Sequence, residues 1–326
     1  MAKVAEVKDV SVSRDRSISV WDRERLLGWM FIAPAVIYIV ALVGFPFVMA
    51  FIYSFSDVTT GDPSIDFVGL RNFKAILNDV TFRRSLKNTF VFTFISQAIV
   101  LVLAKTLALV LEKDFRGKWI ARFLILLPWT APISLGVLAW LWMLDSVFSP
   151  IDWIFRYLGL IGRPAEGVLS VWNFDGFPNL YWLGKPGLAM ASVIGVHVWR
   201  MLPLATMILL AGLTSIPKDI LDAAEVDGAR FWRRLFHVII PMMLPIMSVA
   251  VLFGVIFTFT DMTIIRVLTQ GNPPPHMTQV LASWAYFKGI DGGDLAQGAA
   301  IALFLFPVMA GVAVFILRFA RRTEVT

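Results

Sequence analysis

Two charged side chains lie within otherwise apolar stretches of the sequence, and they are the first candidates for chemistry. Arg200 interrupts the run 186–217, and Asp261 lies with Thr263 near the end of another run. Charges inside a bilayer are costly and usually mark functional positions. A guanidinium, a carboxylate and a hydroxyl could hydrogen-bond to a polar solute, so Arg200, Asp261 and Thr263 are predicted to line a solute path. Two alternatives stay open: Arg200 braces a neighbouring helix, and Asp261 caps a helix end.

Other side chains offer little for catalysis or cofactor binding. The sequence has no cysteine, and its three histidines, His197, His237 and His276, are scattered, so we expect no metal site. The phosphate-binding pattern G-x-x-x-x-G-K-[ST] is missing, and the fragment 184–186 has proline where the hydroxyl residue belongs. We therefore expect no catalytic residue and no ATP or other cofactor on this chain. A membrane-bound enzyme is the weaker alternative, and turnover by the purified chain would support it.

The surrounding chain is too apolar for an ordinary soluble domain. It has 326 residues, of which 58% are hydrophobic and 16% are charged. The apolar residues are pooled into runs of the roughly 20 residues that a membrane-spanning helix needs. Lys105 also interrupts a run, close enough to its end to snorkel. We therefore predict an all-α polytopic membrane protein with six transmembrane helices, near residues 28–55, 87–111, 120–144, 187–213, 241–266 and 295–318.

The distribution of Lys and Arg predicts how these helices are oriented. Most basic residues fall in the N-terminal tail, the turn 113–122, the loop 214–240 and the C-terminal tail. Basic loops resist translocation, so both termini are predicted to be cytoplasmic. The formal charge of +6 follows from this bias, and we expect a lipid bilayer rather than a nucleic acid as the partner.

One cytoplasmic loop has the pattern of a short helix closed at both ends. Pro217 suits a first helical turn, Asp219 and Asp222 place negative charge near the positive end of the helix dipole, and Gly228 suits the left-handed position that ends a helix. The centre, 223–224, is Ala-Ala, so another protein surface could approach the backbone closely. From these properties alone, an ordinary interfacial connector is an equally good interpretation.

The same segment resembles the cytoplasmic motif of permeases in binding-protein-dependent ATP-binding-cassette importers, E-A-A-x-x-x-G-x9-I-x-L-P. Here it reads Asp222-Ala223-Ala224, then Gly228, then 238–241 as Val-Ile-Ile-Pro, with the spacing kept and conservative departures at three positions. Further segments are similar to the maltose and glycerol-phosphate branch of that family. They are Phe67-Val68-Gly69-Leu70-Arg71-Asn72-Phe73, Leu127-Pro128-Trp129, Leu210-Ala211-Gly212-Leu213 and Val267-Leu268-Thr269-Gln270-Gly271-Asn272-Pro273.

The resemblance implies a type I importer permease fold and a transport subunit that is not itself an enzyme. Its partners would be a second homologous permease, two ATPase subunits that hold ATP and Mg, and an extracytoplasmic solute-binding protein. The complex would import a sugar or related polar solute across the cytoplasmic (inner) membrane of a bacterium or archaeon. The helix 217–227 would seat in an ATPase groove, and the implied coupling residues are Asp222, Ala223, Ala224, Asp227, Gly228 and Pro241.

The same resemblance divides the chain into functional segments. The expected segments are a cytoplasmic tail 1–27, a first transmembrane helix 28–55, an extracytoplasmic loop 56–86, a permease core 87–318 with the coupling loop 214–240, and a cytoplasmic tail 319–326. The broken loop 146–185 is a candidate docking site for the solute-binding protein. A secondary transporter driven by an ion gradient remains an alternative, and ATP-independent uptake by this chain alone would support it.

Overall fold

The computed structural model describes residues 24–161, 179–272 and 276–323. The chain divides into two compact units, one up to Met49 and one from Ala50 onward. Regular structure in the described ranges is helical throughout. The helices are α1 (Glu24–Ile39), η2 (Val40–Gly44), α2 (Phe45–Ser54), α3 (Arg71–Asn78), α4 (Val80–Glu112), α5 (Lys118–Thr130), α6 (Ile133–Met143), α7 (Pro150–Tyr157), α8 (Pro186–Thr214), α9 (Lys218–Val226), α10 (Phe231–Arg234), η4 (Leu235–Ile239), α11 (Ile240–Thr260), α12 (Thr263–Leu268), α13 (Leu281–Tyr286), η5 (Phe287–Asp291) and α14 (Leu295–Thr323).

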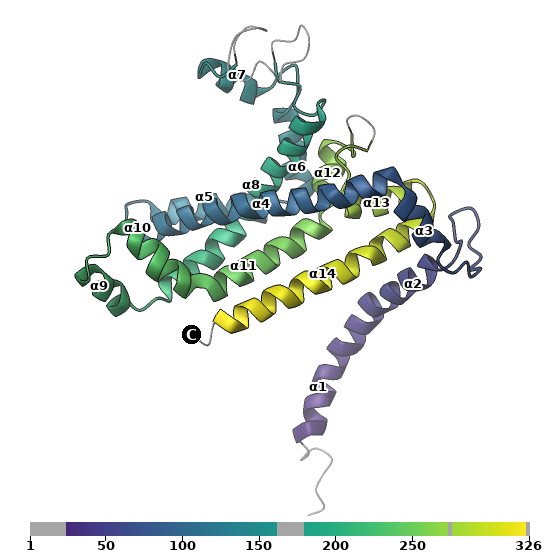
Figure 1. Cartoon of the computed structure of the whole chain (residues 1–326), viewed down its shortest axis with the longest axis horizontal. Coiled ribbons are helices and arrows are strands. Elements are labelled where there is room, and N and C mark those ends of the chain that lie inside the picture. Colours follow the sequence, from purple (N-terminus) through teal and green to yellow (C-terminus); the bar gives the residue numbers. More distant parts are fainter. Residues whose placement is uncertain (1–23, 162–178, 273–275, 324–326) are drawn as a thin grey trace, which may run out of the picture. The chain divides into compact units, whose positions relative to one another are not determined.

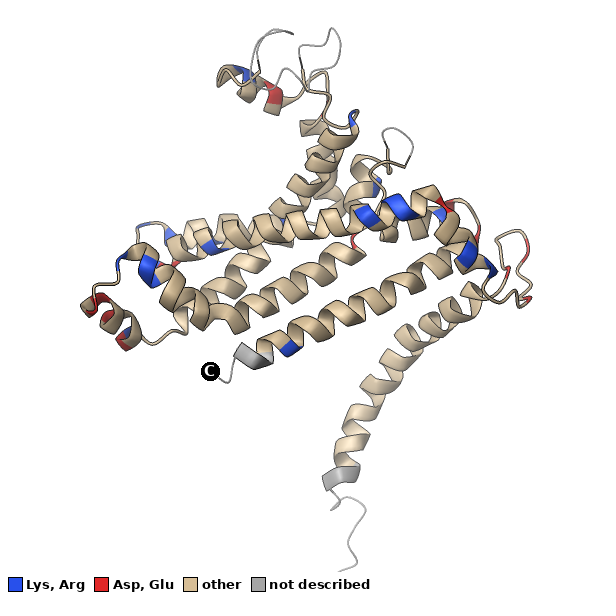
Figure 2. Ribbon diagram, in the orientation of Figure 1, with Lys and Arg blue, Asp and Glu red and all other residues tan. Residues whose placement is uncertain are grey.

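Five helical segments are long and apolar enough to cross a membrane. They are Leu27–Ser54, Val80–Glu112, Pro186–Thr214, Phe231–Thr260 and Leu295–Ala320. Charged residues gather near the ends of α4, α11 and α14, whereas the middle parts of these helices carry almost none (Figure 2). This is the distribution that a hydrocarbon layer requires, because a charge at its centre is costly.

The predicted third transmembrane helix, 120–144, is not one straight helix. It is divided into α5 and α6, which together are long and apolar enough for one span but are bent by 97°. Ala131, which precedes Pro132, is extended with φ −68° and ψ 142°, as a proline requires of the residue before it. Each half alone, at about 1.5 Å per residue, is shorter than the roughly 30 Å hydrocarbon layer. The bent pair therefore forms a sixth span only if α5 and α6 cross the hydrocarbon layer one after the other, as a single broken span.

Other predicted boundaries move by up to several residues. The loop 56–86 contains the whole of α3 and the beginning of α4. The predicted fifth span, 241–266, ends at Thr260, after which Asp261 separates α11 from the short α12. Polar residues at these positions form caps and turns, which hydropathy alone does not register.

The core of the second unit is built by α4, α8 and α11. Helix α8 packs against both α4 and α11, and α11 also packs against α14 (Figure 1). Buried Ala104 and Ala108 lie on α4, and small residues of this kind let helix backbones approach closely in a membrane. This packing brings polar side chains from α4, α8 and α11 together.

Candidate functional site

The predicted coupling helix forms as expected between Pro217 and Gly228. Pro217 is the N-cap of α9 and Asp227 is its C-cap. Asp219 lies in the first turn, where its charge favours the positive end of the helix dipole. Sequence reasoning places Pro217 one position further into the helix than the structure does.

Gly228 closes this helix in the manner that its sequence pattern predicts. Its φ is +74°, and its N–H donates to Glu225 O at 3.0 Å while the N–H of Ala229 donates to Ala224 O at 2.9 Å. These two bonds form a Schellman motif. A Cβ added at Gly228 would meet nothing within 4 Å, so the requirement for glycine here comes from backbone conformation alone.

The predicted coupling residues fall into two groups. Asp222, Ala223, Asp227 and Gly228 are exposed on α9 and its cap, and Ala224 is half-buried. Pro241 lies apart from them, in the first turn of α11. The π-helical turn η4 precedes it, and such turns occur where the regular hydrogen-bond ladder is interrupted.

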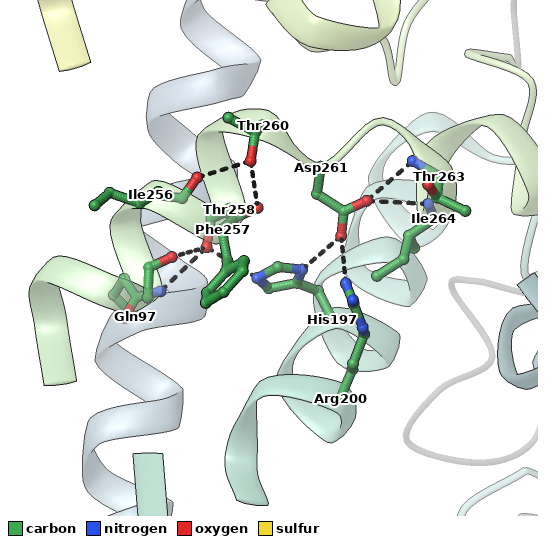
Figure 3. A network of polar contacts seen from close by, with 11 residues as sticks. Gln97, His197, Arg200, Ile256, Phe257, Thr258, Thr260, Asp261, Thr263 and Ile264 are labelled. Atoms are coloured by element: carbon green, nitrogen blue, oxygen red, sulfur yellow. Dashed lines mark hydrogen bonds and ion pairs between the residues drawn. The ribbon is translucent and has the colours of Figure 1, made fainter. Parts of the chain in front are cut away.

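A buried polar network forms the second candidate site (Figure 3). His197 of α8 is fully buried, and its Nδ1 lies 3.0 Å from Asp261 Oδ2 while its Nε2 lies 2.9 Å from Thr258 Oγ1. Gln97 Nε2 of α4 donates to the same threonine oxygen at 3.1 Å. Three helices are thus joined through one hydroxyl and one imidazole.

The Thr258 hydroxyl lies at the centre of this network. Its oxygen accepts from Gln97 Nε2 and also lies 2.7 Å from Gly254 O, while the two ring nitrogens of His197 contact Thr258 on one side and the Asp261 carboxyl group on the other. The imidazole therefore links the α11 hydroxyl to the carboxyl group beside Arg200.

Arg200 and Asp261 are brought together, as are Asp261 and Thr263. Arg200 Nη1 lies 3.8 Å from Asp261 Oδ2, and the guanidinium lies over the Trp129 ring at 5.7 Å from its centroid. Asp261 Oδ1 accepts from the N–H groups of Thr263 at 3.0 Å and Ile264 at 3.3 Å. Asp261 is the C-cap residue of α11, its carboxyl group accepts from the first two N–H groups of α12, and it pairs with Arg200 of a neighbouring helix. Its side chain is only 3% exposed.

Sequence reasoning did not single out Gln97, His197 and Thr258. A signal was present, because His197 lies three residues before Arg200 on α8 and Thr258 lies three before Asp261, which places each pair on one helix face. The pairing across helices could not be read from spacing, since 64 residues separate His197 from Asp261 and 161 separate Gln97 from Thr258.

The family described as "Binding-protein-dependent transport system inner membrane component" matches residues 100–325, which is well over half of the chain. This chain belongs to that family. It is therefore a multi-pass membrane subunit of a transport system and not an enzyme in its own right, and the sequence-based interpretation as an importer permease is confirmed.

Curated relatives align over nearly the whole chain. The trehalose/maltose transport system permease protein MalF of Thermococcus litoralis is 29% identical over 92% of this chain and 95% of that protein. The trehalose transport system permease protein SugA of Mycobacterium tuberculosis is 32% identical over 89% of this chain and 87% of that protein.

A solved structure shows the same fold. A chain of the bacterial alginate ABC transporter in complex with an alginate pentasaccharide-bound periplasmic protein has a TM-score of 0.75 and 18% identity, covering 94% of this chain and 98% of that one. The expected importer permease fold is thereby confirmed.

Proposed function

We propose that this permease imports a carbohydrate or a related polar solute, driven by ATP hydrolysis on separate subunits. Two observations support the solute class. Relatives across nearly the full length are permeases named for trehalose and maltose. At the buried network, the Arg200 guanidinium is 23% exposed, and its hydrogen-bond donors suit a hydroxyl-rich solute better than an apolar one.

The proposed complex contains a second homologous permease, two ATPase subunits carrying ATP and Mg, and an extracytoplasmic solute-binding protein. It lies in a bacterial or archaeal cytoplasmic membrane with both termini of this chain inside. The distribution of basic residues supports this orientation. It assigns the segments 1–27, 214–240 and 319–326 to the cytoplasmic side and the loop 56–86 to the extracytoplasmic side. The loop 146–185 is proposed to contact the binding protein; residues 162–178 of it lie outside the described ranges.

The single observation that carries the proposal is the exposed, closed helix α9. Asp222, Ala223 and Ala224 form its small-residue surface, and Asp227 and Gly228 fix its end. A helix with a fixed end and small side chains at its centre is suited to insertion into a groove of an ATPase subunit. Pro241 would hold the angle at which α11 continues from this loop into the membrane.

The proposed solute path runs beside Arg200, Asp261 and Thr263. The Arg200 side chain is 23% exposed, so its guanidinium remains accessible while Asp261 is buried behind it. Asp261 thus acts on the solute by positioning Arg200, and Thr263 contributes through the backbone N–H that it donates to Asp261.

The coupling proposal is tested by enlarging Ala223. Because Ala223 is exposed, Ala223→Leu leaves folding intact and blocks only a close approach from outside. We expect ATPase subunits to dissociate from the purified variant and uptake to be lost. Ala75→Leu, an exposed alanine of α3, is the matched control. Normal uptake by Ala223→Leu would contradict the assignment.

The transport proposal is tested with the complete complex in liposomes. Trehalose, maltose and sn-glycerol 3-phosphate are presented with the binding protein, and ATP hydrolysis is measured. We expect one sugar to stimulate hydrolysis and to accumulate inside. Accumulation driven by an ion gradient without ATP would instead establish the secondary-transporter alternative.

A further inference from the structure

The connection between α11 and α14 forms a folded cap. Its described parts are α12, residues 269–272 and 276–280, α13 and η5. Because α11 is a candidate span, this connection lies on the opposite side of the membrane from α9. Under the proposed orientation it faces the extracytoplasmic side, from which solute arrives.

A polar cavity of about 340 Å³ opens in this cap, separate from the buried network. It is lined by Arg266, Gln270, Asn272, His276, Phe287 and Asp291. All of these side chains except Phe287 are polar. The volume lies at the lower end of the roughly 300–1,000 Å³ range of ligand pockets, which suits one sugar ring.

Arg266 and Asp291 are held in a fixed arrangement at the wall of this cavity. Their two parallel contacts include Nη2 to Oδ1 at 3.0 Å, and a second joins Nη1 to Oδ2. The guanidinium also lies 4.3 Å from the centroid of the Tyr286 ring. Both side chains remain accessible, at 44% and 30% exposed. A neutral pair of this kind offers donors and acceptors together and favours neither an anion nor a cation.

Two residues that line the cavity have backbone conformations that residues other than glycine rarely adopt. Gln270 has φ +51° and His276 has φ +63°. Such left-handed positions cost roughly 1–2 kcal/mol each and persist only where the surrounding structure enforces them. Conformational cost of this kind concentrates at functional sites.

Hydrogen bonds hold the described residues beside these two positions. Thr278 Oγ1 donates to Asn272 O at 2.7 Å and lies 2.9 Å from Thr269 Oγ1. The Asn88 side chain of α4 donates to Met277 O at 2.8 Å and to Gln279 O at 2.9 Å. The cavity wall is thus preorganised by contacts to the membrane core.

His276 supplies an unused polar atom. Its ring lies 5.0 Å from the centroids of both Trp284 and Phe287, and its buried Nδ1 has no hydrogen-bond partner among the described residues. Burial lowers the pKa of this imidazole below its usual value of 6.5. The neutral ring has one donor and one acceptor nitrogen, as hydroxyl recognition requires.

From this geometry we propose that the cavity is an entry site for one sugar ring, which the solute occupies on the extracytoplasmic face before it reaches the buried network. Gln270, His276 and the Arg266–Asp291 pair bind the hydroxyls, Phe287 packs against the ring, and Asn272 lines the cavity beside them. This assignment rests on the proposed sugar transport and names a second position along the same path.

The absence of cysteine from the sequence permits a direct test. Asn272→Cys places a thiol in the cavity, and Ala75→Cys on α3 is the matched exposed control. The complete complex is treated with a charged thiol reagent in the presence of D-glucose, trehalose or inorganic phosphate. We expect a sugar to slow labelling at position 272 and not at position 75.

A second substitution tests the proposed contacts. Asp291→Asn in the Asn272→Cys background should raise the sugar concentration needed for protection about tenfold or more, because a charged hydrogen-bonding group is lost. Should this variant fail to assemble, His276→Gln serves the same purpose. If neither substitution changes the sugar concentration needed for protection, the assignment is overturned.

The other outcomes separate the entry site from the transport proposal. Sugar-stimulated ATP hydrolysis without protection by the same sugar would overturn the entry site and leave sugar transport standing. Protection without stimulated hydrolysis would support the site and count against sugar transport. Protection by phosphate alone would show an anion site, and protection by the sugar-free binding protein alone would show a protein contact. Either result would overturn the proposal.

Discussion

Gly228 offers the sharpest test of how the coupling helix works. Its φ of +74° is left-handed, and a Cβ there would meet nothing within 4 Å. Substitution by alanine therefore costs only the conformational penalty, about 1–2 kcal/mol. That energy corresponds to a factor of about 5–30 in the population of the closed helix end.

Because the penalty acts on the ratio of closed to open helix ends, we expect the affinity of the ATPase subunit for the purified permease to fall measurably in Gly228→Ala, by up to about 5–30-fold. Gly228→Asn should lose less, because asparagine tolerates the left-handed region better than alanine. Gly61→Ala is the matched control, since its added Cβ also meets open space and its φ is not left-handed.

The assay is the dissociation constant of the ATPase subunit, measured with the permease in nanodiscs. Membrane insertion and thermal stability of each variant are followed alongside. The argument that docking selects the closed C-terminal end of α9 would be refuted if Gly228→Ala were correctly inserted and bound the ATPase subunit with wild-type affinity.

Three further outcomes follow from the buried network and the cap. His197→Ala removes one hydrogen-bond partner of buried Asp261, which keeps Arg200 and two backbone N–H groups, and should destabilise the permease by about 1–3 kcal/mol, measured by thermal unfolding; a smaller loss in the double variant with Asp261→Asn would show the coupling. Gly254→Ala places a Cβ 2.1 Å from Gln97 Oε1 and should impair uptake, with partial rescue by Gln97→Ala; impaired uptake that Gln97→Ala leaves unchanged would place the clash elsewhere. Because burial lowers the pKa of His276, the unfolded chain binds that proton more readily, so stability should decline as the pH falls below 6.5; His276→Gln should decline less, and an equal decline would exclude this residue as the cause.

The sequence alone determined the membrane class, most of the spans, and the short helix 218–226 with its glycine cap. Each of these depends on neighbouring residues: a run of apolar side chains must meet lipid, and the helix end at Gly228 is fixed by a φ that few other residues adopt. The bend between α5 and α6 also had a local cause in Pro132, but hydropathy counts a proline-containing apolar run as one span.

Tertiary structure alone decided which polar groups meet. His197 reaches Asp261 across 64 residues, and Arg266 reaches Asp291 across the folded cap. Spacing cannot reveal such pairs, because they depend on how α4, α8 and α11 pack and on how the described residues 269–272 and 276–280 are held. The sequence therefore identified Arg200 and Asp261 as unusual, whereas packing gave them partners and made the polar cavity beside Arg266.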